Sequence, residues 1–399
     1  MKNLLIKIGK VIALFQRGSF GGEMRSLGEK TWRLLNLFLN FSGGKVVFVV
    51  GGLGDSAMYR GFNVAEELSF QGVKATILSI DDPLLFWKIK KFKIVVLVKI
   101  VDWQKGRKIL QLADELNQKV LYDTDDLVFI GELFKQTEAY RNFNTWQRKQ
   151  YAENGMEKIL ASKEVRAITT TTNFLKEKLR RFEKKVLVVE NKLSQRDWQW
   201  AKEARKKYIQ RLSTSDNEGG VAIGYFSGSV SHNRDFKTIE PVLRDILSKM
   251  PFVNLCLVGY LDIEDDFYRD FKSQIRQLPF VSRRKHFQNI AKVDINLIPL
   301  EMNDFCQAKS AVKFFEAGAV GVPSVAVRNQ TFSEAIIDGE TGFLAMEKTE
   351  WAEKLNKLIV DRELRINMGQ SARKVVSEKY LTINGDKEYC DFLDNLESS

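Results

Sequence analysis

Two lysines and a glutamate in one apolar stretch have a spacing that suits an anionic ligand. Lys309, Lys313 and Glu316 stand at i, i+4 and i+7, so a helix over residues 309–319 would present them on one face. The helix dipole disfavours lysines near a helix N-terminus unless an anion joins them. The pattern predicts a buried helix that binds a diphosphate, with Ser310 beside it. The alternative is a partly exposed face with helical spacing.

Three carboxylates crowd the end of a predicted strand over residues 119–123. Asp123, Asp125 and Asp126 fall within four residues, and like charges this close raise one another's pKa. One interpretation is a DxD metal site for a sugar-nucleotide diphosphate, and another is binding or deprotonation of a substrate hydroxyl. The third is a solvated loop in which Asp125 or Asp126 caps a helix.

Two loops of small residues each join a predicted strand to a predicted helix. Glycine lets the backbone approach a ligand closely, and the following helix N-terminus offers free N–H groups to an anion. The first loop, residues 51–56, lacks the full GxGxxG spacing and is equally typical of a tight turn with Ser56 as N-cap. The second, residues 228–235, adds hydroxyls and one cation. The candidate ligand-binding residues of the two loops are Gly52, Gly54, Asp55, Gly228, Ser229, His232 and Arg234.

Short apolar runs alternate with helical patterns along most of the chain. Continuous runs of this length are typical of parallel strands covered on both faces by helices, so the sequence predicts an α/β protein. In such sheets ligands bind beyond the carboxyl ends of the strands, which is where each candidate falls. The expected strands are residues 45–50, 74–79, 92–98, 119–123, 167–171, 185–190, 221–228, 253–259, 293–299 and 323–327, and the expected helices include 56–71, 132–161, 235–249, 264–277 and 351–396.

The alternation of strands and helices stops once and then restarts, which divides the chain. Residues 45–194 are expected to form one Rossmann-like domain, and residues 221–380 a second one in tandem. Residues 195–220 are charged and end in a polar, glycine-containing segment, so they are predicted to be the linker. Residues 1–44 are predicted to be an N-terminal extension of amphipathic helices, and residues 381–399 a helical tail.

The charge balance of the chain favours an anionic partner. Among 399 residues, 62 Lys and Arg exceed 51 Asp and Glu, which gives a net charge of +11, and a hydrophobic content of 44% excludes disorder. A nucleic-acid groove needs basic residues gathered in one block with aromatic residues between them. Here the basic residues are dispersed along the chain, which disfavours nucleic acid as the partner. Residues 1–20 have a basic amphipathic pattern that fits an anionic membrane surface or, alternatively, a helix docked on the protein's own core. The cations of that pattern are Lys2, Lys7, Lys10 and Arg17.

Cysteine and histidine are too sparse to build a metal centre. The three cysteines lie far apart without a CxxC pair, and the chain has only two histidines. Sparse cysteines favour a reducing compartment, and no run approaches the roughly 20 apolar residues that a membrane span needs. We therefore expect a cytoplasmic protein, and the basic N-terminal pattern adds a peripheral position on the inner face of the plasma membrane.

The two halves of the chain together resemble a known family. The segment KSAVKFFEAGAVGVPSVA (309–326), followed by DGETGFL (338–344), resembles the donor-binding region of GT-B glycosyltransferases, especially the family 4-like retaining enzymes. The first half is similar to their acceptor domain in its Gly-rich first loop, its YDTDD strand end (122–126) and its VVEN segment (188–191). The resemblance implies two Rossmann-like domains facing a cleft, with a C-terminal helix over 381–399 that crosses back to the first domain.

The resemblance assigns a donor-binding role to residues of the second half. Glu316 matches a glutamate that contacts the nucleotide ribose, whereas Ala308 replaces the family's preceding glutamate. Arg234 matches a pyrophosphate-binding lysine, and Ser229 stands where the family has an arginine. We expect two lysines of this half to supply the missing positive charge, namely Lys309 and Lys313.

The resemblance also points to catalytic and acceptor-binding residues. The family's acceptor-domain histidine is absent, and Asp123 or Asp125 is the nearest candidate in its place. The expected catalytic residues are thus Asp123, Asp125, Lys313 and Glu316, and further substrate-binding residues in the first half are Arg60, Asp126 and Asn191.

The function that the resemblance implies is sugar transfer from a nucleotide-diphosphate donor to a glycan or lipid-linked glycan in bacterial surface polysaccharide synthesis. The anomeric configuration is expected to be retained, without a metal and without a cofactor. The alternatives are a catalytically inactive scaffold, because Ala308 replaces a glutamate, and a DxD metal-dependent transferase. A Rossmann oxidoreductase is disfavoured by the missing GxGxxG, and a non-enzymatic scaffold that binds nucleic acid or membrane is the remaining class.

Overall fold

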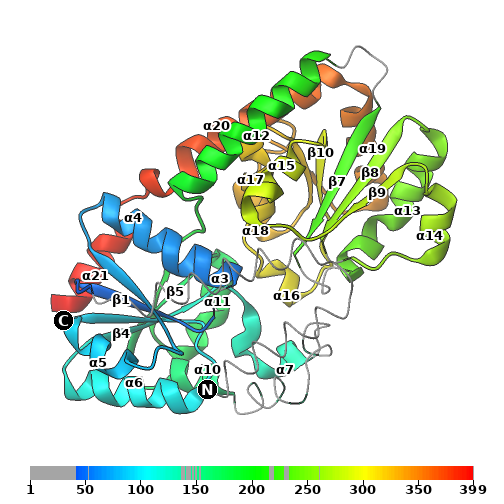
Figure 1. Ribbon diagram of the computed structural model, residues 1–399. Coiled ribbons are helices and arrows are strands. Elements are labelled where there is room, and N and C mark those ends of the chain that lie inside the picture. The colour runs from blue at the N-terminus through cyan, green and yellow to red at the C-terminus, as the bar shows by residue number, and fades with distance from the viewer. Residues whose placement is uncertain are drawn as a thin grey trace. The chain divides into compact units, whose positions relative to one another are not determined.

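The chain divides into two compact units, which we describe separately. The computed structural model describes residues 42–52, 54–135, 140, 145, 148, 151, 154–214, 220–228, 233–259 and 261–398. The first unit comprises the chain up to Lys192 together with Gly385–Ser399, and the second comprises Leu193–Asn384. Each unit is an open sheet with helices on both faces (Figure 1). The amphipathic helices predicted within residues 1–44 fall almost wholly outside the described residues.

The first unit contains a six-stranded sheet in which every neighbouring pair is parallel. The strand order is β2-β1-β3-β4-β5-β6, so the chain changes direction across the sheet between β1 and β3. Their sequences, VVFVV and IVVLV, are fully buried because helices cover both faces. The strands are β1 (Val46–Val50), β2 (Ala75–Ser79), β3 (Ile94–Val98), β4 (Lys119–Thr124), β5 (Val165–Thr170) and β6 (Lys185–Val188).

The C-terminal helix α21 (Glu388–Ser398) belongs to the core of the first unit. Its residues Tyr389, Phe392 and Leu393 pack in one buried cluster with β1 and with α4 (Val64–Phe70). α21 and α4 lie on one face of the sheet, while α5 (Leu85–Lys88) and α6 (Trp103–Glu115) lie on the other (Figure 1). The remaining helical segments are α3 (Asp55–Ala57), the π-helix η1 (Met58–Asn63), the 3-10 turns η2 (Ile89–Lys91), η3 (Leu127–Phe129) and η4 (Arg180–Phe182), α7 (Gly131–Lys135), α10 (Gly155–Ala161) and α11 (Asn173–Leu179).

The second unit contains another six-stranded parallel sheet, in the order β12-β11-β10-β7-β8-β9. This is the order of a doubly wound dinucleotide-type fold, with its change of direction between β7 and β10. Ligands in such sheets bind beyond the carboxyl ends of the two strands at that point. The strands are β7 (Val221–Ser227), β8 (Val253–Gly259), β9 (Ile275–Leu278), β10 (Ile295–Ile298), β11 (Ser324–Val327) and β12 (Phe343–Ala345).

Four helices pack together on one face of the second sheet: α12 (Gln195–Thr214), α15 (Arg283–Ile290), α17 (Val312–Val320) and α20 (Arg362–Lys379). Gly369 of α20 lies against the backbone of Gly321, where a Cβ atom would meet the Gly321 carbonyl oxygen at 2.0 Å. Glycine therefore sets the close approach of α20 to the end of α17. The other helical segments are α13 (Asn233–Lys249), α14 (Asp265–Phe271), α16 (Asp304–Gln307), α18 (Gln330–Ala335), α19 (Lys348–Val360) and the 3-10 turn η6 (Thr382–Asn384).

The structure corrects several predicted elements. The predicted linker 195–220 is mostly helix α12, whose buried face carries Ala201, Ala204 and Tyr208. Its many charges line the outer face of the helix, which is why composition alone suggested a linker. The helix predicted over 264–277 is also wrong, because α14 ends at Phe271 and strand β9 follows.

Three further observations concern membrane spans, the cysteines and the stretch over residues 132–161. Among the described residues, no helix has both the length and the apolar character that crossing a bilayer requires. The three cysteines, Cys256, Cys306 and Cys390, are buried free thiols. In the stretch predicted as one helix over 132–161, the structure describes α7, α10 and a few single residues between them.

The position of Leu393 in the first core predicts a local effect of its truncation. Leu393→Ala should destabilise the first unit by about 2–5 kcal/mol, because Leu393 is fully buried and its loss leaves a cavity. Hydrogen exchange followed by mass spectrometry should show faster exchange in β1 and β3 and unchanged exchange in β7 and β8. Asn395→Ala, at an exposed position of the same helix, is the control. Equal exchange in Leu393→Ala and the parent would contradict the packing role of α21.

Candidate active site

The donor-side candidates gather at the point of the second sheet where the strand order changes direction. β7 ends at Ser227 and is followed by Gly228, and α13 then begins at Asn233. β10 is followed by a short connection to α16 and α17. The sequence therefore places the loop after β7 and the N-terminus of α17 at the ligand-binding edge that this strand order provides.

Lys313 is the most unusual residue at this edge. Its Nζ atom is buried and has no hydrogen-bond partner among the described residues, and it lies 5.2 Å from the centre of the Tyr225 ring. Burial lowers the pKa of Lys313 from its ordinary value, although Asp235 opposes that effect. Asn296 of β10 donates a hydrogen bond of 3.1 Å to the Lys313 carbonyl oxygen and so fixes the backbone at this point. An unpaired buried ammonium is costly, so its position favours an anion that completes the site.

The structure places Lys309 differently from the prediction. α17 begins at Val312 with Ala311 as its N-cap, so Lys309 and Ser310 lie in the turn before the helix. The two lysines and Glu316 therefore do not share one helix face, as their spacing had predicted. The Nζ of Lys309 lies 4.4 Å from the centre of the Phe305 ring. Lys309 and Lys313 are nevertheless near enough that the charge of Lys309 contributes to lowering the pKa of Lys313.

Asp235 is a site residue that sequence reasoning left without a role. Its Oδ1 accepts hydrogen bonds from the Glu301 backbone N–H at 2.9 Å and from the Cys306 thiol at 3.6 Å. The ligand atoms of Asp235, Glu301 and Cys306 lie within 4.8 Å of one another, a spacing that a cation could use. Burial and the neighbouring Asp235 raise the pKa of the Cys306 thiol to about 12, so this donor set suits a metal poorly. The available signal for Asp235 was its place in the first turn of the helix that follows β7.

Glu316 is held in a fixed orientation by two basic side chains of α15. Its Oε1 accepts a hydrogen bond of 2.8 Å from Arg283, and its Oε2 lies 3.0 Å from Nε2 of His286. Arg283 also donates to both carboxylate oxygens of Asp197 at the start of α12, at 2.6 and 3.2 Å. Sequence reasoning found Glu316 and missed these three partners, because they are distant in the chain.

The other donor-side candidates lie in or near the loop after β7. Gly228 is exposed at the end of β7, and Arg234 is exposed in the first turn of α13. Ser229 and His232 lie outside the described residues. Ala308, which stands in place of the family's preceding glutamate, is fully buried.

On the acceptor side, Asp123 is enclosed in a hydrogen-bonded network. Arg60 donates to both oxygens of Asp123, at 3.0 and 2.7 Å, and Thr169 donates to the second at 2.6 Å. Arg60 also donates to Asn191 Oδ1 at 3.1 Å. Asp123, Arg60 and Asn191 are all buried, and this network uses their polar groups. The structure thus gives these three residues a structural role, and their contact with substrate stays a prediction.

Asp125 is instead part of an accessible cluster centred on Lys99. The Lys99 ammonium donates to Asp125 Oδ1 at 3.0 Å, to Asp126, and to Ser56 Oγ at 3.3 Å. Burial alone would raise the pKa of Asp125, but Lys99 and the Ser56 hydrogen bond outweigh it and hold the pKa at about 2. Asp125 is therefore ionised at neutral pH. Lys99 had only one signal in the sequence, its place directly after strand β3.

The Lys99 cluster bears on two interpretations of the acidic segment. Asp126 Oδ1 accepts the Val128 backbone N–H at 3.1 Å, so Asp126 caps η3 as the capping interpretation proposed. A DxD metal site would need a cation beside the carboxylates, and here Lys99 and Arg60 supply positive charge to all three.

The Gly-rich loop after β1 reaches the same edge of the sheet through Ser56, which accepts a hydrogen bond from Lys99. Its candidates are Gly52, the α3 N-cap Gly54, and the exposed Asp55.

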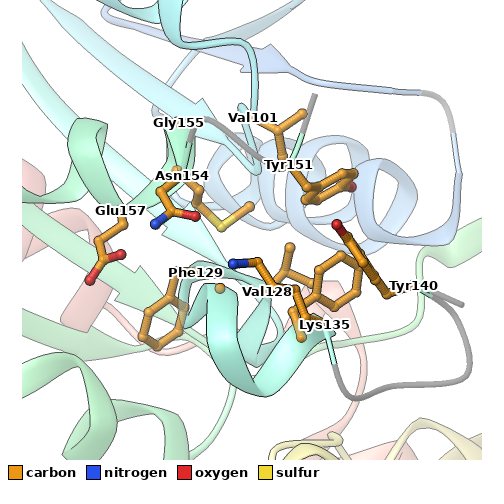
Figure 2. Close-up of a pocket in the computed structure, with 12 residues that line it drawn as sticks. Val101, Val128, Phe129, Lys135, Tyr140, Tyr151, Asn154, Gly155 and Glu157 are labelled. Atoms are coloured by element: carbon orange, nitrogen blue, oxygen red, sulfur yellow. The ribbon is translucent and has the colours of Figure 1, made fainter. Parts of the chain in front are cut away.

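A small pocket lies near this cluster in the first unit. Figure 2 shows Tyr140 and Tyr151 on one side of it, and Asn154 and Glu157 on the other. Phe134 contacts both tyrosines, with ring centres 5.6 and 4.9 Å apart. Tyr151 connects the pocket to the cluster, because burial raises the pKa of Tyr151 and the nearby Lys99 charge opposes part of that increase. No sequence motif marked this pocket.

Comparisons of the fold define the class of protein. Anabaena HepE, solved in complex with UDP-glucose, has a TM-score of 0.60 and 14% sequence identity over 88% of this chain and 100% of that chain. WaaG, described as a glycosyltransferase involved in lipopolysaccharide biosynthesis, has a TM-score of 0.58 and 14% identity over 89% of this chain and 100% of that chain. The two parallel α/β units of this protein form the GT-B fold.

Comparison of the sequence finds a family match within the second unit. Residues 222–375 match the model of the family described as glycosyl transferases group 1. The capsular polysaccharide biosynthesis glycosyltransferase CapM of Staphylococcus aureus is 28% identical over 182 residues, which cover 44% of this chain and 45% of that relative. The sequence alignment thus spans less than half the length of this curated relative.

The Lys99 cluster predicts a change in the pH dependence of stability. In the parent, Asp125 has a depressed pKa, so its ionised form contributes to the free energy of unfolding above about pH 4. This contribution is lost as pH falls towards 2. Lys99→Met removes the largest cause of that depression and leaves only the Ser56 hydrogen bond and Arg60 to oppose burial. Because the Asp126 carboxylate then also lies unneutralised beside it, the pKa of Asp125 should rise above its unfolded value. The variant should therefore be less stable at pH 7 and should regain stability as pH falls towards 4.

Urea unfolding at a series of pH values between 7 and 4 measures this prediction. Lys105→Met is the matched control, because Lys105 forms a similar pair with Asp81 at 3.0 Å without touching Asp125. Its stability should not increase as pH falls in this range. The same pH profile in both variants would contradict the assignment.

Proposed function

We propose that this protein transfers a sugar from a nucleotide-diphosphate donor to a hydroxyl group of a glycan or lipid-linked glycan. The family match within the second unit and the GT-B fold support this reaction class. The relative CapM is named for capsular polysaccharide biosynthesis, and WaaG for lipopolysaccharide biosynthesis, which supports a role in assembly of a surface polysaccharide. HepE was solved with UDP-glucose, which supports a nucleotide sugar as donor.

The buried ammonium of Lys313 is the observation that carries the proposal. A diphosphate at the N-terminus of α17 would accept a charge-assisted hydrogen bond from Lys313 and contacts from the first backbone N–H groups of the helix. Lys309 and Arg234 add positive charge at the same edge of the second sheet. Charge that develops on the leaving diphosphate would be stabilised by groups already in position, which is a major source of catalysis in group transfer.

Glu316 and Asp125 complete the proposed assignment of roles. Glu316, oriented by Arg283 and His286, would accept hydrogen bonds from the nucleotide ribose. Asp125, ionised beside Lys99, would bind or orient the acceptor hydroxyl. The proposal includes retention of the anomeric configuration, with the departing phosphate accepting the acceptor's proton, and it requires no metal and no cofactor.

Replacement of Lys313 by methionine should separate ligand binding from folding. Lys313→Met removes an unpaired buried charge, so the thermal midpoint of the ligand-free protein should stay the same or rise. Affinity for the donor should fall about tenfold to a hundredfold, because a charge-assisted hydrogen bond of about 1.5–3 kcal/mol is lost. A thermal-shift screen against a panel of nucleotide sugars identifies the donor and measures both effects.

The control for this variant is Lys249→Met, an exposed lysine in α13 of the same unit. It should leave the affinity for the donor unchanged. If Lys313→Met binds nucleotide sugars as tightly as the parent, then Lys313 is not a phosphate ligand and the proposed function loses its main support.

The chemistry of the transfer predicts its response to a chelator. Activity should persist in EDTA, because Lys313, Lys309 and Arg234 take the place of a metal beside the diphosphate. NMR of the product should show the same anomeric configuration as the donor sugar. Loss of activity in EDTA that is restored by a divalent cation would favour the DxD mechanism, and absence of both transfer and donor hydrolysis would favour an inactive scaffold.

A further inference from the structure

In the segment between β2 and β3, apolar side chains are exposed to solvent and a charged side chain is buried. Leu84, Phe86 and Trp87 are exposed to 46, 37 and 53% of their surface, whereas the neighbouring Lys88 is 2% exposed. A segment that served only the core would bury the aromatic rings and leave the lysine in water. The reversal indicates that these apolar side chains have a use outside the first unit's own core.

The exposed side chains stand on a firmly held backbone. Leu85 and Ile89 of the same segment are buried in the core, and Lys88 forms a buried ion pair of 2.8 Å with Asp82. The other oxygen of Asp82 accepts the Leu84 backbone N–H at 2.8 Å. The outward position of Leu84, Phe86 and Trp87 is thus fixed by the fold.

A side chain from the turn after α6 also holds this segment in place. Gln118, in the turn after α6, donates from Nε2 to the carbonyl oxygens of Ile89 and Phe92, at 2.9 and 2.6 Å. α5 and α6 lie on the same face of the first sheet, opposite α4 and α21 (Figure 1). The exposed rings therefore belong to the outer surface of that helical layer.

Lysines surround these apolar side chains. Lys90 and Lys91 are exposed in η2, and the Lys91 ammonium lies 4.3 Å from the centre of the Trp87 ring. The acidic residues of the segment are already paired, Asp82 with Lys88 and Asp81 with Lys105. We call Leu84, Phe86, Trp87, Lys90 and Lys91 the α5 patch, and its surface combines exposed aromatic rings with two exposed lysines.

We propose that the α5 patch binds the surface of a bilayer that contains anionic phospholipid. Tryptophan and phenylalanine lie at the boundary between headgroups and acyl chains, and lysines beside them contact the anionic headgroups. The net charge of +11 acts in the same direction. This inference goes beyond the proposed sugar transfer and does not depend on it, because binding to a bilayer requires neither donor nor acceptor.

Co-sedimentation of the full chain with vesicles tests the proposal. The parent should bind vesicles of phosphatidylcholine with phosphatidylglycerol and should bind phosphatidylcholine alone much more weakly. Phe86→Ser combined with Trp87→Ser should reduce the partition coefficient about tenfold or more, since two interfacial rings are lost. Lys90→Gln combined with Lys91→Gln should also weaken binding and should reduce its sensitivity to salt. Phe252→Ser, at a position 52% exposed in the second unit, is the control and should bind as the parent does.

Three outcomes would overturn the proposal. The first is vesicle binding by the Phe86 and Trp87 double variant that equals that of the parent. The second is equal binding of the parent to neutral and anionic vesicles. The third is a smaller sedimentation coefficient of the double variant in the absence of lipid, which would assign the patch to contact with a second copy of the chain.

A separate readout distinguishes this proposal from the proposed function. The double variant should keep the thermal shift of the parent with nucleotide sugars, because the α5 patch lies in the first unit and Lys313 in the second. This thermal shift also verifies that the double variant is folded. Failure of the vesicle test with an intact thermal shift would overturn only the membrane proposal, and loss of Lys313-dependent nucleotide binding would bear only on the transferase.

Discussion

A cation buried at the end of a β-sheet must be balanced by negative charge, and this requirement organises both units. In the first unit the balance is internal. Arg60 lies against Asp123, and Lys99 lies against Asp125 and Asp126. Two cations and three carboxylates thereby lie at the carboxyl edge of one sheet, and each of them contacts a group of opposite charge. The π-helix η1, which carries Arg60, forms at the point where that guanidinium enters the sheet edge.

In the second unit the balance is incomplete, and this contrast gives the two sheet edges different chemistry. Glu316 contacts the guanidinium of Arg283 and the imidazole of His286. Lys313 is the opposite case, an ammonium whose Nζ has no hydrogen-bond acceptor among the described residues. An edge with a surplus of positive charge is suited to a ligand with several negative charges, while the balanced edge of the first unit is suited to a neutral ligand such as a sugar. The proposed division of donor and acceptor follows from this difference.

The sequence predicted those parts of the structure that depend on local pattern. Apolar runs located ten strands and the restart of the fold, because a strand covered on both faces has few polar positions. β9 and β12 escaped, since IRQL is largely exposed and FLA is only three residues long. α12 was predicted as a linker because its charged outer face dominates its composition.

The sequence predicted which residues belong to the candidate site better than it predicted their partners and their exact positions. Lys313, Glu316 and Asp125 were found from spacing and strand ends, and the structure gives each a distinctive charge environment. Their partners could not be found in this way, because Lys99 is 26 residues from Asp125, and Arg283 is 33 residues from Glu316. The turn that removes Lys309 from α17 was also beyond spacing arguments, since a helical repeat does not reveal where a helix begins. Only the packing of β10 against α17, through Asn296, sets that boundary.

The location of α21 has a consequence for the order in which the chain folds during synthesis. All six strands of the first unit are translated before the second unit begins, yet Tyr389, Phe392 and Leu393 reach that core only after the second unit has been translated. The second unit is continuous from Leu193 to Asn384, so it can fold as soon as it leaves the ribosome. The core of the first unit is therefore completed after the second unit has been made.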